Sequence, residues 1–221
     1  MFNTTIATQI YAKICFEATN SQKKIIENLS EYLSGDDFSR IFVLNGFAGT
    51  GKTTLIAAVV AALKELRIKP VLLAPTGRAA KVLARYCGEQ ALTIHKRIYR
   101  QRTNADYESK FSLDFNREQG AVFIVDEASM LSDSTGDGAL FGSGSLLEDL
   151  VSYVRSGRGC RLILVGDSAQ LPPVGCDFSP ALDPATVSRY GEVVYGLMDE
   201  VVRQQMQSGI LFNATLVRCM L

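Results

Sequence analysis

A glycine-rich stretch between an apolar run and a helix-forming segment holds the residues best suited to chemistry. Residues 46–53 read GFAGTGKT, which fills the pattern G-x-x-x-x-G-K-[ST]. In this pattern small residues let backbone N–H groups surround a polyphosphate, and the N-terminus of the following helix points at it. Lys52 would then reach the β- and γ-phosphates, and the Thr53 hydroxyl would ligate Mg²⁺. The apolar run Ile41–Leu44 before the motif and the Ala-, Leu- and Val-rich segment after it supply the required context.

Two further polar groups each follow an apolar run. Asp126 and Glu127 come directly after residues 122–125. Gln170 lies in the sequence GDSAQ, after residues 161–165. Hydrolysis of a nucleoside triphosphate needs one carboxylate for the metal and another that orients the attacking water, which fits the acidic pair. The alternatives are that the acidic pair caps the next helix and that Gln170 belongs to a Pro-Pro turn facing solvent.

These groups need a scaffold that brings the ends of strands together. Short apolar runs alternate with helical patterns, which predicts parallel βαβ units and a sheet with helices on both faces. The expected strands are 41–44, 70–74, 121–126, 161–165 and 193–197, and the expected helices are 20–34, 52–66, 78–86, 146–154 and from 200 onward. Asn20 or Ser21 is the predicted cap of the first helix. Ligands of such a sheet lie outside the carboxyl ends of its strands, so Asp167 and Gln170 should share an edge with Lys52 and Asp126.

Two stretches interrupt this alternation. Thr93–Tyr99 is compatible with a short helix, and the polar stretch Thr103–Gln119 with its alternating apolar residues predicts a small surface hairpin. Ser132–Ser145 is rich in Gly, Ser and Asp, which predicts a mobile loop. The sequence pattern assigns no function to either insertion.

Composition narrows the class of protein without identifying a partner. The chain has 221 residues, 47% of them hydrophobic, with 23 basic and 23 acidic side chains. It can therefore bury a core, and its net charge indicates neither nucleic acid nor an acidic membrane as partner. The segment Arg78–Arg102 is an exception, since it contains seven basic residues and one acidic residue, Glu89. Such a segment either contacts a nucleic acid or is a solvated face.

The cysteines and the N-terminal region indicate the compartment. The five cysteines are scattered and form no C-x-x-C pair, and the only histidine is His95. Reduced thiols and the absence of a zinc site are the simplest interpretation. The first thirty residues show no apolar core followed by a cleavage site, so we expect a cytoplasmic protein without signal peptide, membrane span or membrane partner.

Several stretches, taken in order, resemble superfamily 1 DNA helicases of the RecD-like and Dda-like branch. They are residues 46–54, 74–81, 93–95, 125–130 and 166–175, with 202–210 resembling the fourth motif of the family. The resemblance covers roughly residues 20–217, and motifs in the right order are more specific than any one of them. It implies an α/β P-loop NTPase with a RecA-like, mostly parallel sheet. It also implies that ATP hydrolysis drives movement along single-stranded DNA, usually 5′ to 3′.

The resemblance implies roles for individual residues. Glu127 would be the catalytic base, Gln170 would couple the γ-phosphate to DNA, and Arg203 would contact phosphate. Thr53 and Asp126 would hold Mg²⁺. The residues implied to contact ATP are Gln22, Gly46, Ala48, Gly49, Thr50, Gly51, Lys52, Thr53 and Thr54. The residues implied to line the track of single-stranded DNA are Pro75, Thr76, Arg78, Thr93 and His95.

The resemblance also bears on domain organisation. Family members continue into a second RecA-like domain that supplies an arginine to the ATP site, whereas this sequence ends at Leu221. We therefore expect a first motor domain over residues 1–198 and the start of a second over 199–221. Since an arginine supplied across the cleft accelerates phosphoryl transfer about a thousandfold or more, this chain should be a monomer that binds ATP but hydrolyses it poorly. Gln22, implied to read the adenine, is by position an ordinary surface residue at a helix start.

Two other functions are compatible with the same residues. One is an RNA or RNA/DNA translocase of the same superfamily, because no sequence feature reads a 2′-hydroxyl group. The other is a nucleotide-switched binding module, in which ATP only changes the shape of a docking surface. Glu127 distinguishes the second alternative, because a motor needs the carboxylate for turnover and a switch does not.

Overall fold

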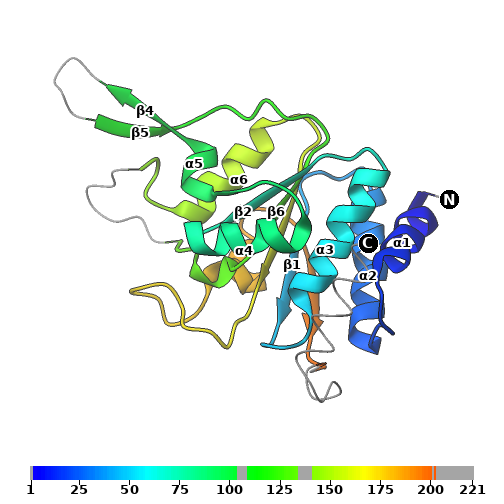
Figure 1. The fold of residues 1–221 in the computed structure, drawn as a ribbon. Coiled ribbons are helices and arrows are strands. Elements are labelled where there is room, and N and C mark those ends of the chain that lie inside the picture. The colour runs from blue at the N-terminus through cyan, green and yellow to red at the C-terminus, as the bar shows by residue number, and fades with distance from the viewer. Residues whose placement is uncertain (1, 104–108, 134–140, 201, 203–221) are drawn as a thin grey trace.

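A six-stranded sheet forms the centre of the structure, a computed structural model that describes residues 2–103, 109–133, 141–200 and 202. The strand order is β3-β2-β6-β7-β1-β8 (Figure 1). The strands are β1 Ile41–Gly46, β2 Pro70–Ala74, β3 Ala91–Thr93, β6 Val122–Val125, β7 Arg161–Gly166 and β8 Val193–Met198. Every neighbouring pair is parallel, so the carboxyl ends of all six strands lie along one edge.

The predicted parallel sheet is confirmed, and its five predicted strands are all present. The sequence pattern misses β3, which pairs with β2 so that Ala74 lies opposite Thr93. A strand of three residues is too short for a period of two to be visible. β8 lies at the edge of the sheet beside β1, as expected for the last strand.

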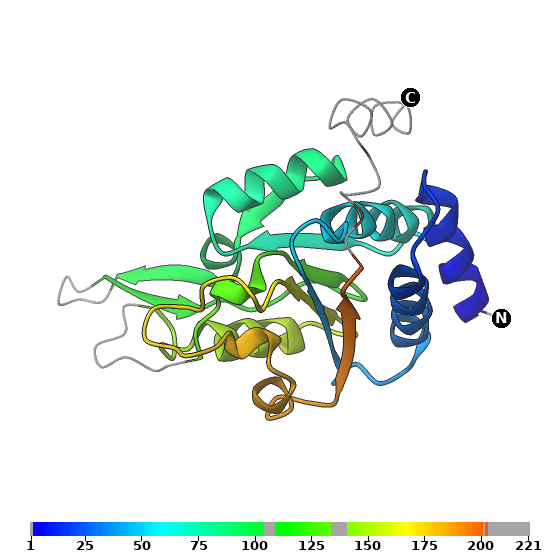
Figure 2. The ribbon, with the colours of Figure 1, turned by 90° about the horizontal axis from the view of Figure 1, so that it is seen from below.

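Helices cover both faces of the sheet, as predicted. One side carries α1 Phe2–Lys13, α2 Asn20–Ser34, α3 Lys52–Glu65 and α4 Gly77–Cys87. The other carries α5 Ile94–Ile98, α6 Leu146–Ser156 and α7 Pro184–Val187, with 3-10 turns at Ala128–Met130 and Pro180–Leu182. Figure 2 shows α3 and α4 on one side of the sheet and α6 on the other.

Successive residues of the central strands point to opposite faces, because the side chains of a strand alternate. Phe42 and Leu44 belong to the core on the side of α2 and α3. Ile41 and Val43 belong to the core on the side of α6. Every residue of β1 is buried, which explains why this strand reads as a continuous apolar run rather than an alternating one.

Helix α2 begins with a cap that differs from the predicted one. Thr19 is the N-cap, and its Oγ1 accepts a hydrogen bond from Gln22 N at 3.3 Å. Thr19 N in turn donates to Gln22 Oε1 at 3.0 Å. This reciprocal pair is a capping box, which satisfies two backbone N–H groups at once. The predicted caps, Asn20 and Ser21, therefore lie inside the helix.

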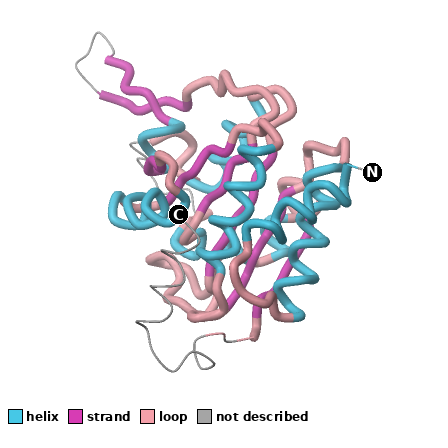
Figure 3. Tube along the Cα trace, turned by 45° about the vertical axis from the view of Figure 1, so that its right-hand side comes forward, coloured by secondary structure: helices cyan, strands magenta, loops and turns pink. Residues whose placement is uncertain are grey.

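The predicted surface hairpin is present and projects from the sheet (Figure 3). It consists of β4 Tyr99–Thr103 and β5 Ser109–Leu113, which are antiparallel. Its first strand begins at Tyr99, earlier than predicted, directly after the short helix α5. The strand is predicted too late because Tyr99 is the only apolar residue of 99–103, so no apolar alternation marks its start.

Parts of two other predictions lie outside the described residues. The predicted mobile loop Ser132–Ser145 is described only at its two ends, since residues 134–140 are not included. The helix predicted from Glu200 onward also falls largely outside the described part of the chain. Both remain predictions.

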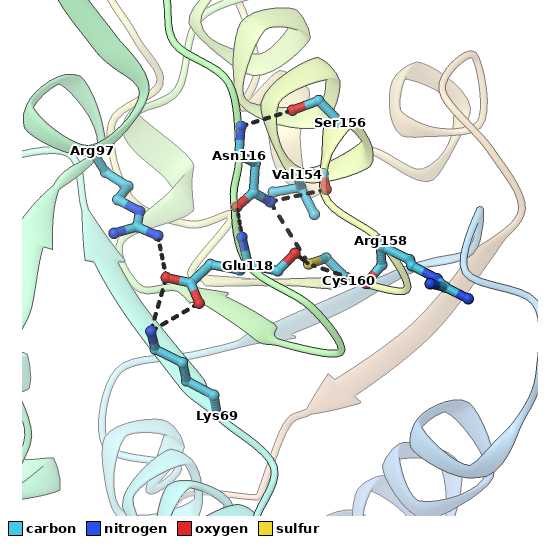
Figure 4. A network of polar contacts seen from close by, with 8 residues as sticks. All are labelled: Lys69, Arg97, Asn116, Glu118, Val154, Ser156, Arg158 and Cys160. Atoms are coloured by element: carbon cyan, nitrogen blue, oxygen red, sulfur yellow. Dashed lines mark hydrogen bonds and ion pairs between the residues drawn. The ribbon is translucent and has the colours of Figure 1, made fainter.

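A polar network lies at the amino ends of β2, β6 and β7, at the opposite end of these strands from the phosphate motif (Figure 4). Glu118 accepts hydrogen bonds from Lys69 Nζ at 2.9 Å and from Arg97 Nη2 at 2.7 Å. Glu118 N donates to Asn116 Oδ1 at 3.0 Å, and Asn116 Nδ2 donates to Val154 O at 3.2 Å. The network therefore ties α5 and α6 to the segment that enters β6.

The charge of Glu118 should contribute to stability. Burial acts to raise the pKa of Glu118, but hydrogen bonds and charge from Lys69 and Arg97 outweigh burial and hold this pKa below its usual value. Glu118→Gln is expected to lower the free energy of unfolding by roughly 1–2 kcal/mol at pH 7, because two cations lose their anionic partner. A carboxylate whose pKa is lower in the folded state than in the unfolded state stabilises the folded protein fully at pH values above its unfolded pKa. This stabilisation is lost as the pH falls through the folded-state pKa.

Urea unfolding of wild type and Glu118→Gln at several pH values measures this contribution. The difference between them should shrink between about pH 5 and pH 3, the range around the unfolded pKa of a glutamate and below it. Glu17→Gln, at an exposed position, is the matched control and should show no such difference. A Glu118→Gln difference that is constant with pH would mean that the carboxylate charge is not what stabilises the network.

The described cysteines do not all follow the prediction. Cys87, Cys160 and Cys176 are free thiols, whereas Cys15 is disulfide-bonded. The expectation of reduced thiols throughout is therefore wrong for Cys15, since sequence spacing does not report which cysteines meet in three dimensions. In the part of the chain that the structure describes, no helix has the length and apolar character needed to span a membrane.

Candidate nucleotide and nucleic-acid sites

The phosphate motif forms a tight loop between β1 and α3. Gly49 and Gly51 have φ angles of 84° and 87°, a left-handed conformation that strongly favours glycine. Thr50 is buried, and its Oγ1 donates to Phe47 O at 2.8 Å. Gly51 is the N-cap of α3, so Lys52 opens the helix. The loop therefore presents the N–H groups of a helix N-terminus, the arrangement that binds phosphate.

The Lys52 ammonium group contacts this loop and is attracted by three carboxylates. Its Nζ donates to loop carbonyl oxygens, including Phe47 O at 3.0 Å, and lies 3.9 Å from Asp167 Oδ2. Burial lowers its pKa, while attraction by Asp167, Asp126 and Glu127 opposes this shift. The structure thus brings together residues from the ends of β6 and β7 with the loop after β1. Thr53 and Thr54, half-buried in the first turn of α3, lie beside Lys52 in sequence.

Asp126 and Glu127 follow β6, and Glu127 has an unusual backbone conformation. Burial raises the pKa of Asp126 to about 6, opposed by the hydrogen bond from Glu127 N, which is 3.0 Å from Asp126 Oδ1. Glu127 has a φ of 55°, in the left-handed region. A residue with a β-carbon rarely adopts this conformation, which costs about 1–3 kcal/mol and is found preferentially at functional sites.

The strand that carries Asp126 is not the neighbour of the strand that carries the phosphate motif. β7 lies between them, because β1 pairs with β7 and β7 pairs with β6. The carboxylate that forms an ion pair with Lys52, at 3.9 Å, is Asp167 at the end of β7, a buried side chain. The order of motifs along the chain does not reveal that β7 lies between β1 and β6, since consecutive strands need not be neighbours in a sheet.

Gln170 links the two loops that follow β6 and β7. Its backbone N donates to Asp167 O at 3.1 Å, and its Oε1 accepts a hydrogen bond from Ser129 Oγ at 3.4 Å. Ser129 lies in the 3-10 turn directly after Glu127. Gln170 is therefore connected through one side chain to the turn that carries the predicted base.

Asn45 is a residue of the site that the sequence predictions do not include. Its Nδ2 donates to Ser168 Oγ at 2.8 Å and to Tyr195 OH at 2.9 Å. Its Oδ1 accepts from Ser168 N at 3.0 Å. Asn45 thus fixes the loop after β7 against β1 and β8. A polar side chain at the end of an otherwise apolar strand is the signal that could have revealed it.

Gln22 supports the phosphate loop in this structure. It is buried, its Oε1 takes part in the capping box of α2, and its Nε2 donates to Thr50 O at 3.1 Å. The prediction of a surface position is therefore wrong, because the helix start packs against the loop. The contact of Gln22 with adenine stays a prediction.

The chain after β8 returns to the phosphate loop. Phe47 N donates to Met198 O at 3.2 Å, and Val202 N donates to Gly49 O at 3.1 Å. Arg203 follows next in the sequence but lies outside the described residues. Its phosphate contact stays a prediction, as does the domain boundary expected at this point.

Four of the five residues predicted to contact DNA can be placed beside one another at the ends of β2 and β3. Ala74 pairs with Thr93, so the segments that leave these two strands are neighbours. Thr76 and Thr93 are the N-caps of α4 and α5, and each Oγ1 accepts a backbone hydrogen bond at 3.2 Å. Pro75 is half-buried and Arg78 is exposed. This group occupies the same edge of the sheet as the phosphate loop.

His95, the fifth of these residues, is half-buried in an aromatic cluster. Its ring lies 5.6 Å from the Tyr99 ring and 5.1 Å from the Phe141 ring, centroid to centroid. Burial lowers the pKa of His95. Since the unperturbed value is already about 6.5, the ring is neutral at pH 7 and suited to stacking or hydrogen bonding.

Comparison with protein families finds one that matches most of the chain. Residues 17–210 match the family described as AAA domain, a range that includes the phosphate loop, both acidic residues after β6 and the predicted DNA track. The chain belongs to the AAA domain family. The matched range covers most of the 221 residues.

Relatives of this AAA domain confirm the resemblance to RecD-like superfamily 1 helicases. The ATP-dependent RecD2 DNA helicase of Deinococcus radiodurans is 33% identical over 135 residues, which are 61% of this chain and 16% of that protein. The ATP-dependent DNA helicase dda of Enterobacteria phage T4 is 34% identical over 136 residues, which are 59% of this chain and 28% of that protein. The chain thus spans less than a third of the length of either relative.

Solved structures confirm the RecA-like P-loop fold of this AAA domain. The Pif1 helicase from Bacteroides, crystallised in complex with ADP-AlF3 and ssDNA, matches with a TM-score of 0.54 and 18% identity. The match covers 90% of this AAA domain and 45% of that chain. At this level of identity the likeness shows the fold alone.

Proposed function

We propose that this AAA domain is the ATP-dependent motor domain of a DNA helicase that moves 5′ to 3′ along single-stranded DNA. The observation that carries the proposal is that one edge of the sheet holds both sets of residues. Lys52, in the loop after β1, lies 3.9 Å from Asp167 after β7 and is attracted by the charges of Asp126 and Glu127 after β6. Thr76 and Thr93 lie on the same edge, after β2 and β3. Relatives named as ATP-dependent DNA helicases support the choice of DNA.

The residues present fit ATP and Mg²⁺. The Thr53 hydroxyl and the Asp126 carboxylate are hard oxygen donors, and Mg²⁺ in such sites is bound by one or two carboxylates together with substrate phosphates. Bound Mg²⁺ would neutralise charge on the β- and γ-oxygens. Lys52 would exchange the loop carbonyls that it contacts now for phosphate oxygens, and the N–H groups after Gly49 would surround the phosphates.

Glu127 and Gln170 would carry out and transmit the hydrolysis step. Glu127 would orient the attacking water and accept its proton. Its left-handed backbone is held by the hydrogen bond to Asp126. Gln170 accepts a hydrogen bond from Ser129 in the turn after Glu127. A change at the γ-phosphate would therefore be transmitted to both the loop after β6 and the loop after β7. Arg203 and a second RecA-like domain would complete the site.

The DNA track would use the start of α4 and the residues at the ends of β2 and β3. The hydroxyl groups of Thr76 and Thr93 accept helix N–H groups and can each donate their own hydrogen to a phosphate oxygen. Arg78, exposed in the first turn of α4, would supply positive charge. Contacts of this kind position a DNA backbone without reading its sequence.

Binding of labelled oligonucleotides tests the proposal. A single-stranded DNA should bind more tightly than an RNA of the same base sequence, and a non-hydrolysable ATP analogue with Mg²⁺ should change the affinity for DNA. Equal or tighter binding of RNA would favour the RNA translocase instead. An absence of any effect of nucleotide on DNA affinity would contradict a motor, because linkage requires the two sites to influence each other.

Arg78→Ala tests the position of the track. We expect a loss of about 3- to 30-fold in affinity for single-stranded DNA, the effect of one lost phosphate contact, and a smaller dependence of affinity on salt. Arg158→Ala removes an equally exposed arginine at the opposite end of the strands and should leave DNA affinity unchanged. Equal losses in both variants would show a nonspecific effect of net charge.

A further inference from the structure

The sequence pattern assigns no function to the insertions Thr103–Gln119, which includes strand β5 of the hairpin, and Ser132–Ser145. The structure brings them into contact. Phe111 of β5 stacks on Phe141, which lies at the end of the 132–145 loop, with ring centroids 4.5 Å apart and an interplanar angle of 21°. The backbones also meet, because Gly142 N donates to Phe111 O at 2.9 Å and residues 111 and 141 form a parallel bridge. The loop end thus pairs with β5 like a short third strand.

Phe141 also contacts the residues at the base of the hairpin. Its ring lies edge-on to His95 at 5.1 Å and is tilted against Tyr99 at 5.2 Å. Aromatic pairs in such geometries contribute about 0.5–1.5 kcal/mol each beyond the area that they bury. One side chain therefore joins the hairpin, through Phe111, to a residue predicted to contact DNA.

A buried carboxylate anchors this cluster to the main fold. Asp149 on α6 is 5% exposed, and its Oδ2 accepts hydrogen bonds from Tyr99 OH at 2.6 Å and from Ser143 N at 3.0 Å. A β-carbon at Gly142 would lie 1.9 Å from the same oxygen, so the backbone approaches Asp149 as closely as glycine permits. We call residues 141–145 the clamp segment. Asp149 of α6 binds this segment through Ser143 N, and Phe141 within the segment stacks on Phe111 of the hairpin.

We propose that Phe141 is a positioning residue for single-stranded DNA, because it fixes the His95 ring and the β4–β5 hairpin in one arrangement relative to Thr76 and Thr93. This inference rests on the proposed function, since it assumes that His95 contacts DNA. Phe141 acts through His95. DNA that leaves the track at His95 then meets the base of the hairpin in a defined orientation.

Phe141→Ala tests the inference with three measurements. Affinity for single-stranded DNA should fall about tenfold, the effect of roughly 1.4 kcal/mol of lost positioning contacts. Hydrogen exchange of the β4 and β5 amides should accelerate, because the hairpin loses its stacking partner. Affinity for the ATP analogue should stay unchanged, and Phe141→Tyr should restore DNA affinity. Phe115→Ala is the matched control, since Phe115 is a phenylalanine of the neighbouring hairpin insertion, residues 103–119, but is 65% exposed.

A double-mutant cycle with His95→Ala separates positioning from a contact of Phe141 itself. If Phe141 acts through His95, then the double variant should bind DNA no more weakly than His95→Ala alone. Additive losses would overturn the inference, and so would unchanged DNA affinity in Phe141→Ala or a parallel loss of nucleotide affinity. If the wild-type chain bound no single-stranded DNA, then both this inference and the proposed function would fall. Normal wild-type binding without the Phe141→Ala loss overturns this inference alone.

Discussion

Lys52→Ala is expected to lower the affinity of the chain for ATP and Mg²⁺ by about 100-fold. A hydrogen bond to a charged group contributes about 1.5–3 kcal/mol, so the loss of two such contacts to phosphate oxygens corresponds to at least this factor. These contacts are expected because the Lys52 ammonium group already lies against the loop, 3.0 Å from Phe47 O. Titration with a fluorescent ATP analogue measures the change directly.

Lys64→Ala is the matched control for this measurement. Lys64 lies in the last turn of the same helix, α3, and pairs with Glu89 at the surface. Removing its charge changes the net charge by the same amount but should leave nucleotide affinity within about threefold, because exposed ion pairs contribute little. If Lys52→Ala bound the analogue as tightly as wild type, then the loop would not be a phosphate site.

Glu127→Gln is expected to slow ATP hydrolysis by about 100- to 10,000-fold, the usual contribution of a general base, while nucleotide affinity stays nearly unchanged. The amide keeps the shape of the side chain but cannot accept the proton of the attacking water. The hydrogen bond from residue 127 N to Asp126 Oδ1 is a backbone contact that the substitution retains. Since the first domain alone is expected to hydrolyse ATP poorly, the step is measured as phosphate release under single-turnover conditions, with single-stranded DNA present, in a protein that includes the second RecA-like domain.

The control for Glu127→Gln is Glu148→Gln, at an exposed position on α6. This variant should hydrolyse ATP at the wild-type rate. Unchanged hydrolysis in Glu127→Gln would contradict the motor and favour the nucleotide-switched binding module, in which ATP is bound but the carboxylate has no catalytic task. Reduced nucleotide affinity in Glu127→Gln would instead indicate a role in binding.

Most of the candidate nucleotide site can be predicted from the sequence because it is made of contiguous residues. A phosphate loop consists of one turn and one helix start, so the spacing of Gly46, Gly51 and Lys52 is sufficient to identify it. Asp126 and Glu127 can be placed for a similar reason, since they follow a fully buried strand whose apolar run is easy to recognise. The parallel sheet then brings the strand ends to one edge.

The contacts that the sequence does not reveal are those between residues far apart in the chain. Asn45 contacts Ser168 and Tyr195, more than a hundred residues later. Phe141 appears as one apolar residue in a loop, and only the fold places Phe111 and His95 against it. No local pattern encodes such contacts, because they depend on which strands and loops become neighbours.

The sequence by itself determined the fold class, the phosphate loop, the acidic pair and the likeness to RecD-like helicases, because short motifs and apolar periodicity specify local structure. Tertiary structure alone decided that β7 separates β1 from β6, that Gln22 supports the loop through Thr50, and that the clamp segment holds the hairpin. The physical reason is that strand order and long-range side-chain contacts follow from the packing of the whole core. Burial of apolar surface drives that packing, and it does not depend on how far apart in the sequence the packed residues lie.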